Sequence, residues 1–526
     1  MREAAVCCKD QPLQPLRRGS TIKLMQGNFC SFKTSLAVTN SFNLAYQVGI
    51  HASCVCNEIV SLHNRHMLTR NEGMCNITLK KCFKYHRSKY INQYIPPATS
   101  WQIINNYSGA KRQTYVKAFQ NLIETGFLKK YAHISMFVKP DRIKRAEIAA
   151  KAPRAIQARK PEFNLSYARF LHPIEKFIYA QPGTGPTKLG NFAKTYNNVD
   201  RAVHIFAKWS HFKKPVALNI DHSKFDSTIA VPHLRHTHSI YRKFNSSRHF
   251  SLLMQHTIDN VGFTKHGLKY KIRGTRMSGD YDTGLGNSLI NEAVLLYVFR
   301  NFPVEVYIDG DDSVVIFEEE NLKLVDFSLF KKLGFDTKVE VAHHIEQIEF
   351  CQCRMVVGEK PYLARNPFRS LSHLSVSLKH YTKNIWPHYN EARFFCEAFM
   401  NNGIPIMGPI CYKSLQNITM FFDEDTRWMA ENLACTDLPY EEPTLKTRIS
   451  YQRAWGISVE DQITIESEYN TVDKPLALIR ACCSIKTKKF KNFQYANDSL
   501  YAAWTSWRAL GRDCGEYGWD GGSGCL

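Results

Sequence analysis

Two short apolar runs that flank an acidic turn form the clearest pattern in the chain. Residues 304–308 and 313–317 are rich in β-branched and aromatic side chains, and Asp309-Gly310-Asp311-Asp312 separates them. Because glycine accepts the positive φ angle that a tight turn requires, an Asp-Gly pair between such runs predicts a β-hairpin. The hairpin would hold adjacent carboxylates on a rigid support, where they could share a cation. The simpler alternative is a solvated acidic turn on a surface hairpin.

Three further segments have the pattern of strands. Residues 216–221 form an apolar run that ends at Asp221, which predicts a buried strand. Residues 153–159 alternate arginine with apolar side chains, as on a strand with two different faces. Residues 348–357 also alternate and predict one continuous strand, in which the cysteines are packing residues.

Helices are predicted where apolar residues recur every three to four positions and not every second position. A glycine-rich loop at 273–280 leads into a long helix, and Thr283 and Asn287 share one face of it because they are four residues apart. A second helix at 322–333 would end at Gly334, a residue type common just beyond helix ends.

Composition indicates a folded chain with a polyanionic partner. The 526 residues are 44% hydrophobic and 12% aromatic, which indicates a globular protein of about three domain-sized units. Lysine and arginine number 69 against 47 acidic residues, and 69 − 47 gives the formal net charge of +22. Nucleic acid is the first candidate partner for such a charge, and an anionic membrane surface is the second.

The 16 cysteines are expected to be reduced rather than paired in disulfides. The first ten residues lack the apolar core of a secretory signal, and no apolar run approaches about 18 residues, so we expect a cytosolic chain without a spanning helix. Cys54, Cys56, His63 and His66 lie close together, but their spacing is not typical of a zinc site, and buried free cysteines are the preferred interpretation.

The densest basic stretch lies between residues 139 and 160. It could be a solvated charged face, as most charge runs are. The strand-like alternation around Arg154 instead favours a channel for a nucleoside triphosphate, because arginine makes forked contacts with phosphate. The loop from Gly183 to Gly190 lacks the Gly-Lys-Ser/Thr ending of an ATPase phosphate loop and is not interpreted as one.

Asp221 is a candidate metal ligand because it ends a predicted buried strand in a basic protein. Asp226 follows five residues later, past a short polar segment. The alternative is that these carboxylates only form an Asx turn or cap a helix. In the glycine-rich loop, Ser278 and Gly279 occupy positions where backbone could approach a ligand closely, although Ser278 could equally be a helix cap.

In this order, the motifs resemble the signatures of RNA-dependent RNA polymerases of positive-strand RNA viruses, and the wording is most similar to tombusvirus-like polymerases. The matching stretches are Asp221-x4-Asp226 for motif A, Ser278-Gly279-x3-Thr283-x3-Asn287 for motif B, Gly310-Asp311-Asp312 for motif C, Lys338 for motif D, Phe350-Cys351-Gln352 for motif E, and Lys151 to Arg159 for motif F. The resemblance covers roughly residues 96–470.

The resemblance implies roles for these residues in nucleotidyl transfer. Asp221 and Asp311, with Asp312 beside them, would hold two Mg²⁺ ions, or Mn²⁺ in their place. The other implied roles are ribose selection by Asp226, Ser278, Thr283 and Asn287, triphosphate binding by Lys151, Arg154 and Arg159, general acid catalysis by Lys338, and loop positions next to the template at Gly279 and Gly310.

The fold implied by the resemblance is α+β, a right-hand polymerase with fingers, a palm built on an antiparallel sheet, and a helical thumb. The expected boundaries are an N-terminal extension at 1–95, fingers at 96–215 and 241–273, palm at 216–240 and 274–361, thumb at 362–490, and a tail at 491–526. The implied function is RNA-templated RNA synthesis from ribonucleoside triphosphates, with viral template and product RNA as partners. Other replicase proteins and membrane-associated replication complexes in the host cytoplasm are expected to be further partners.

Two other functions are compatible with the sequence. A reverse transcriptase shares an Asp-Asp hairpin, but such enzymes tend to have a bulky aromatic residue where this chain has Asp226. A non-catalytic RNA-binding or scaffold protein would explain the charge of +22 without any chemistry.

Overall fold

The computed structural model describes residues 2–25, 35–38, 47–68, 73–432, 437–438, 440–469 and 479–480. At its centre is a four-stranded antiparallel sheet in the order β11-β12-β8-β13. These strands are β11 (Glu305–Asp309), β12 (Asp312–Glu318), β8 (Pro215–His222) and β13 (Thr337–Ala342). The predicted hairpin is confirmed, because Asp309 pairs with Asp312 across its turn. The strand predicted at 216–221 is confirmed as β8.

Both faces of this central sheet are covered, because successive side chains of a strand point to opposite faces. Leu218 and Ile220 pack with one group of helices in the largest core. Those helices are α5 (Pro161–Tyr179), α8 (Val231–Phe244), α9 (Arg248–Gln255) and α10 (Thr283–Val298). On the other face, Ala217 packs with α6 (Asn198–Ser210) and the hairpin described below. The predicted long helix after the glycine-rich loop is confirmed as α10.

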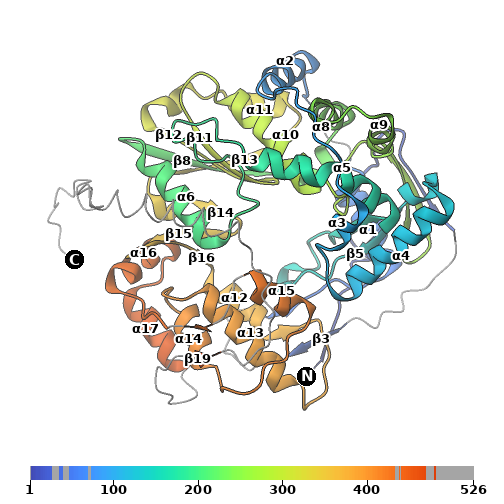
Figure 1. Ribbon diagram of the computed structural model, residues 1–526. Coiled ribbons are helices and arrows are strands. Elements are labelled where there is room, and N and C mark those ends of the chain that lie inside the picture. Colours follow the sequence, from blue (N-terminus) through green and yellow to red (C-terminus); the bar gives the residue numbers. More distant parts are fainter. Residues whose placement is uncertain are drawn as a thin grey trace.

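A second sheet has five strands in the order β2-β10-β9-β5-β7. Its members are β2 (Thr21–Leu24), β10 (Leu268–Arg273), β9 (Asp259–Thr264), β5 (Ile134–Val138) and β7 (Ala155–Arg159). In this sheet β5 and β9 pair in parallel, and the other described neighbours pair antiparallel. The strand predicted at 153–159 is confirmed as β7, and helices α3 (Ser100–Ile104) and α4 (Gly109–Thr125) lie beside this region (Figure 1).

The described residues among the first 95 form sheets with segments that lie far away along the chain. Besides β2, the strands β1 (Arg2–Ala4) and β3 (Ser35–Val38) form a sheet with β17 (Val376–Ser377), and β4 (Val48–Gly49) pairs with β6 (Ile143–Lys144). The helices of this region are α1 (Val55–Ser61), the π-helical turn η1 (Leu62–His66) and α2 (Asn76–Arg87). The N-terminal part is therefore structurally continuous with the rest.

The C-terminal part is helical and has its own core, in which Phe395, Ile410 and Tyr451 are buried. Its helices are α12 (Pro367–Leu374), α13 (Trp386–Met400), α14 (Met407–Lys413), α15 (Glu424–Asn432), α16 (Leu445–Trp455) and α17 (Val459–Glu468). In Figure 1 these helices lie below the central sheet. The predicted tail at 491–526 lies outside the described residues.

The continuous strand predicted at 348–357 is wrong. The segment forms a hairpin of β14 (Glu349–Phe350) and β15 (Cys353–Val357), and β16 (Pro361–Arg365) extends it to three strands. Its turn residues Cys351 and Gln352 have φ angles of +51° and +63°. Because neither residue is glycine, the composition of the segment gave no signal for a turn.

The single helix predicted at 322–333 is also wrong. The chain forms a 3₁₀ segment, η4 (Glu319–Leu324), and then a separate short helix, α11 (Ser328–Lys332). The Asp326 carboxylate accepts a hydrogen bond from the Ser328 backbone at 3.0 Å, and this local bond starts a new helix instead of continuing the first. The predicted end at Gly334 holds, since its φ angle is +96°.

Candidate active site

The register of the central sheet brings the predicted carboxylates to one end. Ser313 of β12 pairs with Ile220 of β8, so the next position places Asp312 beside Asp221. On the other side of β8, Lys338 of β13 pairs with Asp221. Asp221, Asp311 and Asp312 are exposed to solvent, as ligands for a substrate or an ion must be.

The tight turn that carries Asp311 is held from beneath by α10. Gly310 has a φ angle of +70° and Asp311 does not have a positive φ, which fits a two-residue turn with glycine first. The Asn291 amide nitrogen donates to the carbonyl oxygens of Gly310 and Asp311 at 3.1 and 3.2 Å. The Gly310 backbone nitrogen donates to the Ser288 hydroxyl at 3.0 Å.

Asn291 also connects this turn to the strand of Asp221. Its Oδ1 lies 3.3 Å from Nε2 of His222, the residue that follows Asp221. Burial lowers the pKa of His222 to about 4, so the ring is neutral near pH 7. The ring's Nδ1 can accept from the Thr337 hydroxyl, 2.8 Å away, which leaves Nε2–H to donate to Asn291. One amide therefore bonds to both elements that carry the predicted metal ligands.

Like charges crowd at this end of the sheet. Partial desolvation and the carboxylates of Asp311, Asp309 and Asp221 raise the pKa of Asp312 to about 7. Desolvation also raises the pKa of Asp311, and the nearby Arg154 guanidinium opposes this shift. Carboxylates that repel one another in this way are stabilised by a cation between them.

The donor set fits Mg²⁺ or Mn²⁺, which prefer oxygen ligands. Within the described ranges, no group of three or more His, Cys, Asp or Glu side chains is already gathered closely enough to enclose a metal ion. A site of one or two carboxylates completed by water and substrate phosphates is the usual arrangement for Mg²⁺. Asp221 and Asp311 supply such carboxylates.

Asp309 stands at the same turn, but its carboxylate is already paired with two cations. Its carboxylate accepts from Arg201 of α6 at 2.8 Å and from Lys194 at 3.3 Å. Arg201 lies far from the turn along the chain, and no local pattern in the sequence indicated it. The salt bridges anchor the first strand of the hairpin to α6 and its preceding loop.

The predicted ribose-selecting pair is formed. The Asn287 amide nitrogen donates to the Asp226 carboxylate at 2.7 Å, although the two residues are 61 apart in sequence. Arg276 donates to the other end of the Asn287 amide at 3.2 Å and forms a fully buried ion pair with Asp282 at 2.8 Å. Burial, and secondarily the Asp311 charge, raise the pKa of Asp226 to about 6, while the bond from Asn287 opposes the shift.

The two predicted hydroxyls beside this pair bond within the protein. Ser278 accepts from the Gln157 backbone at 3.1 Å and donates to the Ala155 carbonyl at 3.3 Å. The Thr283 hydroxyl lies 2.8 Å from the carbonyl oxygens of Met277 and Asp280. A ribose contact by either residue would have to replace one of these bonds.

Gly279 joins the loop before α10 to strand β7 at close range. Its backbone nitrogen donates to the Gln157 carbonyl at 2.9 Å. A Cβ atom at this position would lie 2.7 Å from the Ala158 Cα, closer than such atoms can approach. Glycine is therefore required for the contact between these two backbones.

Of the predicted triphosphate ligands, Arg154 and Lys151 are accessible. Arg154 lies within electrostatic reach of Asp226 and Asp311, whose pKa values its charge lowers. It also forms a 3.4 Å ion pair with Asp141, although its side chain remains 56% exposed. Lys151 is exposed and pairs with Glu147 at 2.6 Å.

The prediction that Arg159 binds the triphosphate is corrected. Its side chain is 1% exposed and forms an ion pair with Asp280 at 2.6 Å. It also donates to the carbonyl oxygen of Ala132 at 2.6 Å and to Asn260 at 2.7 Å. Because its guanidinium is committed to these buried partners, Arg159 is a structural residue that ties β7 to the loop before α10.

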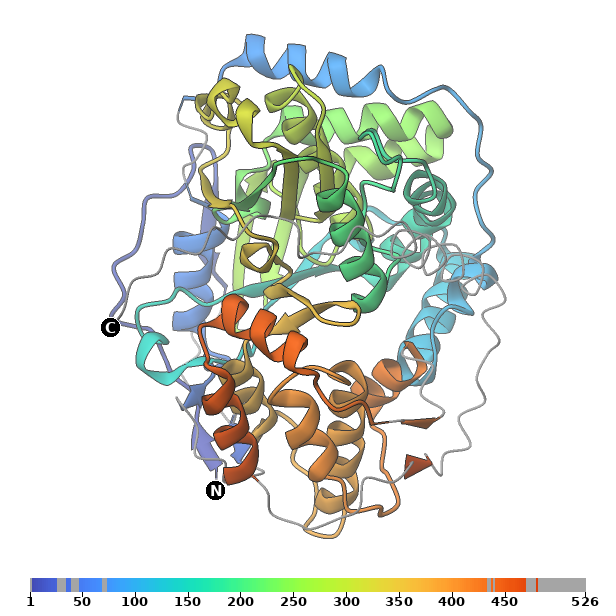
Figure 2. The same ribbon diagram turned by 90° about the vertical axis from the view of Figure 1, so that its left-hand side faces the viewer.

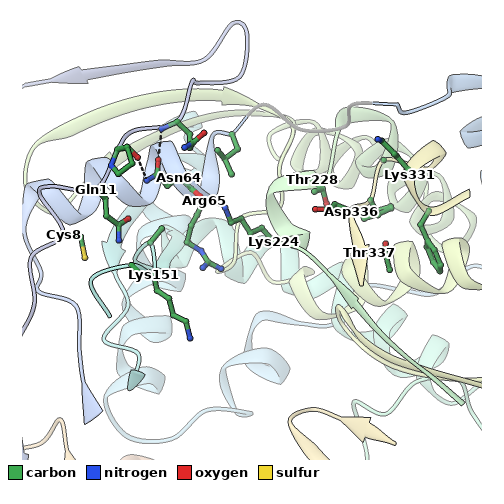
Figure 3. A pocket seen from close by; sticks show the side chains of 18 of the residues that line it. Cys8, Gln11, Asn64, Arg65, Lys151, Lys224, Thr228, Lys331, Asp336 and Thr337 are labelled. Carbon is green, nitrogen blue, oxygen red and sulfur yellow. Dashed lines mark hydrogen bonds between the residues drawn. The ribbon is translucent and has the colours of Figure 1, made fainter. Parts of the chain in front are cut away.

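A cavity of about 1470 Å³ opens beside the carboxylate end of the sheet. Figure 3 shows Arg65, Lys151 and Lys224, from three separate segments, among the side chains that line it. Asp336 and Thr337 also line it, and the Ser223 backbone, two residues from Asp221, bonds to the Asp336 carbonyl at 2.8 Å. The cavity therefore reaches Thr337, which precedes Lys338 and pairs with His222 across the sheet.

The four residues discussed for zinc do not converge on one point. His66 lies 2.8 Å from the Gln157 side-chain amide, and His63 lies 2.9 Å from the Gln14 carbonyl oxygen. The Cys54 thiol lies 3.7 Å from the Cys7 thiol, and neither cysteine is in a disulfide bond.

Comparison with known proteins agrees with this geometry. Residues 25–476 match the family model described as viral RNA-dependent RNA polymerase. The RNA-directed RNA polymerase of groundnut rosette virus is 28% identical over 455 residues, which cover 81% of this chain and 53% of the relative. The polymerase of tomato bushy stunt virus is 34% identical over 69% of this chain and 46% of the relative. That of cucumber necrosis virus is 36% identical over 58% of this chain and 38% of the relative. The chain spans about half the length of the first of these relatives.

Proposed function

The chain belongs to the viral RNA-dependent RNA polymerase family, and we propose that it synthesises RNA on an RNA template from ribonucleoside triphosphates. One observation carries the proposal. Asp221 and Asp311 are 311 − 221 = 90 residues apart, yet they lie at the same end of the central sheet, next to the Asp226–Asn287 pair. A protein that only bound RNA would need the positive charge but not this arrangement of carboxylates.

The fold of a right hand follows from the same proposal. The central sheet with α8 and α10 would be the palm, at 216–240 and 274–361. Apart from β2, which comes from the N-terminal extension, the five-stranded sheet would belong with α3 to α6 to the fingers, at 96–215 and 241–273. The separate helical core would be the thumb, from residue 362. The mixed helix-and-sheet architecture and the two distinct cores support this assignment.

Asp221 and Asp311 would hold two divalent ions, with Asp312 next to them. When bound, the ions would stabilise the attacking and leaving oxygens of an in-line displacement at the α-phosphate. The fixed turn and the antiparallel register place the carboxylates before any ligand arrives, so little reorganisation is needed.

The residues around the carboxylates would position the nucleotide. The Asp226 carboxylate, held by Asn287, can accept a hydrogen bond from a ribose 2′-OH, the group that distinguishes RNA from DNA. Arg154 would neutralise the triphosphate. Lys338, whose pKa is raised by Glu340 and Asp221, stays protonated and could donate a proton to the departing pyrophosphate.

The cavity in Figure 3 would be the route for incoming nucleotides. Its cations, Arg65, Lys151, Lys224 and Lys331, would attract a triphosphate towards Asp221 by charge alone. Asp10 and Asp336 also line it, so the attraction is moderate.

Template and product RNA and ribonucleoside triphosphates are the proposed partners. We propose other viral replicase proteins and membrane-associated complexes of the host cytoplasm as further partners. Among the described helices, none combines the length and the apolar character needed to cross a bilayer.

The function can be tested with the purified chain in primer-extension and de novo assays containing Mg²⁺ and an RNA template. Asp311→Ala should abolish incorporation. Asp259→Ala removes a carboxylate from an exposed ion pair with Arg273 and should leave it unchanged. Template-dependent synthesis by the Asp311→Ala protein would refute the proposed site, and absence of synthesis by the unmodified chain would favour an RNA-binding scaffold.

The ribose-selecting role separates this proposal from a reverse transcriptase. Asp226→Ala should reduce the preference for ribonucleotides over deoxyribonucleotides, because the 2′-OH loses its acceptor. The measurement is the ratio of kcat/KM for the two nucleotides on one template. Unchanged selectivity would remove Asp226 from this role.

A further inference from the structure

Helix α2 presents a basic and apolar surface on the outside of the molecule. Residues 76–94 contain five lysine or arginine residues and no aspartate or glutamate. We define the α2 face as the exposed residues of α2 and of the segment that follows it, namely Ile77, Lys80, Lys81, Lys84, Tyr85, Arg87, Lys89, Ile91 and Tyr94. Within the described part of the chain, none of its five cations forms an ion pair with a carboxylate.

The apolar members of the α2 face are exposed to an unusual degree. Ile77, Ile91 and Tyr94 are 68%, 69% and 73% exposed. Exposing large apolar side chains to water is unfavourable, and several of them on one surface mark an interaction site more often than an isolated one does.

The opposite side of α2 fixes this surface rigidly to the protein. Leu79, Cys82 and His86 are buried, and they repeat with the spacing of one helical face. His86 bonds to the Glu292 carboxylate at 2.8 Å, and the Cys82 thiol lies 3.3 Å from the Ala293 carbonyl, so α10 anchors α2 at two points. Lys243 of α8 also bonds to the carbonyl oxygens of Arg87 and Tyr90.

The α2 face lies away from the proposed catalytic centre. In Figures 1 and 2, α2 crosses the top of the molecule, on the far side of the central sheet from helices α12 to α17. The neighbouring helix α8 adds Arg235 and Arg242, both exposed, to the same side of the fold. An RNA strand in the catalytic centre would not need this surface.

We propose that the α2 face is a docking surface for an anionic lipid bilayer. The five cations complement a negatively charged layer of headgroups. A surface that lies on a membrane inserts its apolar side chains at the boundary of headgroups and acyl chains. Ile77 in the first turn of α2 is available for this, and so are Ile91 and Tyr94 in the segment after the helix. Aliphatic side chains have no comparable use in binding RNA, where bases stack on aromatic rings. This inference rests on the membrane-associated partners proposed above and names the surface that would contact the membrane, but it does not depend on the catalytic function.

Flotation of the full chain with vesicles tests the inference. The chain should float with vesicles of phosphatidylcholine mixed with phosphatidylserine, and much less with pure phosphatidylcholine. Each cation near an anionic surface contributes about a fivefold increase in partition coefficient, so the combined Lys80→Gln, Lys81→Gln and Lys84→Gln variant should bind about 100-fold more weakly. Ile77→Ser with Ile91→Ser should also weaken binding, and this loss should persist at high salt, where charge attraction is screened.

The matched control removes the same charge elsewhere. Lys111→Gln, Arg112→Gln and Lys117→Gln change three exposed residues of α4 and should leave flotation unchanged. Equal losses in the two triple variants would overturn the inference, because binding would then follow net charge and not the α2 face. A loss of affinity for single-stranded RNA without a loss of vesicle binding would also overturn it and identify an RNA surface. Thermal melting of each variant checks that the fold is intact.

Discussion

Asn291→Ala provides the sharpest test of how the active site is assembled. The substitution removes the two hydrogen bonds from the Asn291 amide to the turn carbonyls, at 3.1 and 3.2 Å, and the 3.3 Å contact with His222. Each such bond contributes about 0.5–1.5 kcal/mol net, and leaving a buried partner unsatisfied adds to the loss. If about 1.4–2.7 kcal/mol of the lost hydrogen-bond free energy had stabilised the transition state by holding the carboxylates in position, kcat should fall by about 10- to 100-fold.

The assay is nucleotide incorporation by the purified chain on a primed RNA template. The KM for the nucleotide should change little, because Asp226, Asn287 and Arg154 remain in place. The Mg²⁺ concentration at half-maximal rate should rise, since Asp221 and Asp311 would no longer be fixed relative to each other. A lower kcat and a higher Mg²⁺ requirement at an unchanged KM would identify Asn291 as a positioning residue and not as one that only stabilises the fold. A comparison of the melting temperatures of the two proteins makes the same distinction.

The matched control is Ser313→Ala, next to Asp312 on β12. Among the described residues, the buried Ser313 hydroxyl has no hydrogen-bond partner, so its removal should leave kcat within about twofold. An Asn291→Ala protein with unchanged kcat and an unchanged Mg²⁺ requirement would refute the reasoning. Similar losses in both variants would show that the region responds to any change, without a specific role for Asn291.

Three other predictions follow from the geometry. Gly279→Ala should reduce activity at least tenfold, because the new Cβ would meet the Ala158 Cα at 2.7 Å, whereas Gly284→Ala, with no contact closer than 3.5 Å, should retain activity; equal activities would contradict the close approach. Arg154→Ala should raise the KM for nucleotides at an unchanged melting temperature, whereas Arg159→Ala leaves Asp280 as an unpaired buried charge and should destabilise the fold by about 3–5 kcal/mol in a melting experiment; the reverse pattern would restore Arg159 as a ligand. The melting temperature should fall as the pH is lowered from about 6.5 towards 4, since buried histidines with pKa values lowered to about 3 or 4 take up protons only on unfolding. These are His66, His204, His222, His233 and His238. Asp226, Asp312 and Glu175, with pKa values raised to about 6 or 7, oppose this trend but are fewer, and a melting temperature that rose over the same range would contradict the assignment.

Local patterns were sufficient for the elements that carry the carboxylates. The apolar runs around the turn at 309–312, the run into Asp221 and the period of α10 each depend on a few consecutive residues, and the structure has all three. The pairing of Lys338 with Asp221 depends on the register between β13 and β8, which is set by packing against distant helices. No local pattern in the sequence predicts that pairing, and Lys338 was proposed only because of the resemblance to a family.

Asn291 was missed although its signal was present. Thr283, Asn287 and Asn291 follow one another at intervals of four on an otherwise apolar helix, and the series was recognised only as far as Asn287. Extending it would have predicted a third polar group on the same face. The turn at Cys351 and Gln352 had no comparable signal, because two residues other than glycine adopt positive φ angles only under tertiary constraint.

The buried position of Arg159 follows from the alternation of side chains along a strand. Arg154 and Arg159 are five positions apart, so on a regular strand their side chains point to opposite faces. The structure agrees, because Gln157 and Arg159 share the buried face of β7 while Arg154 is exposed near Asp311. A motif compared letter by letter assigned both arginines to one ligand, whereas the two-residue period of the strand already assigned them to different surroundings. Where a resemblance gives several residues of one strand the same role, the parity of their positions is therefore a test that needs only the sequence.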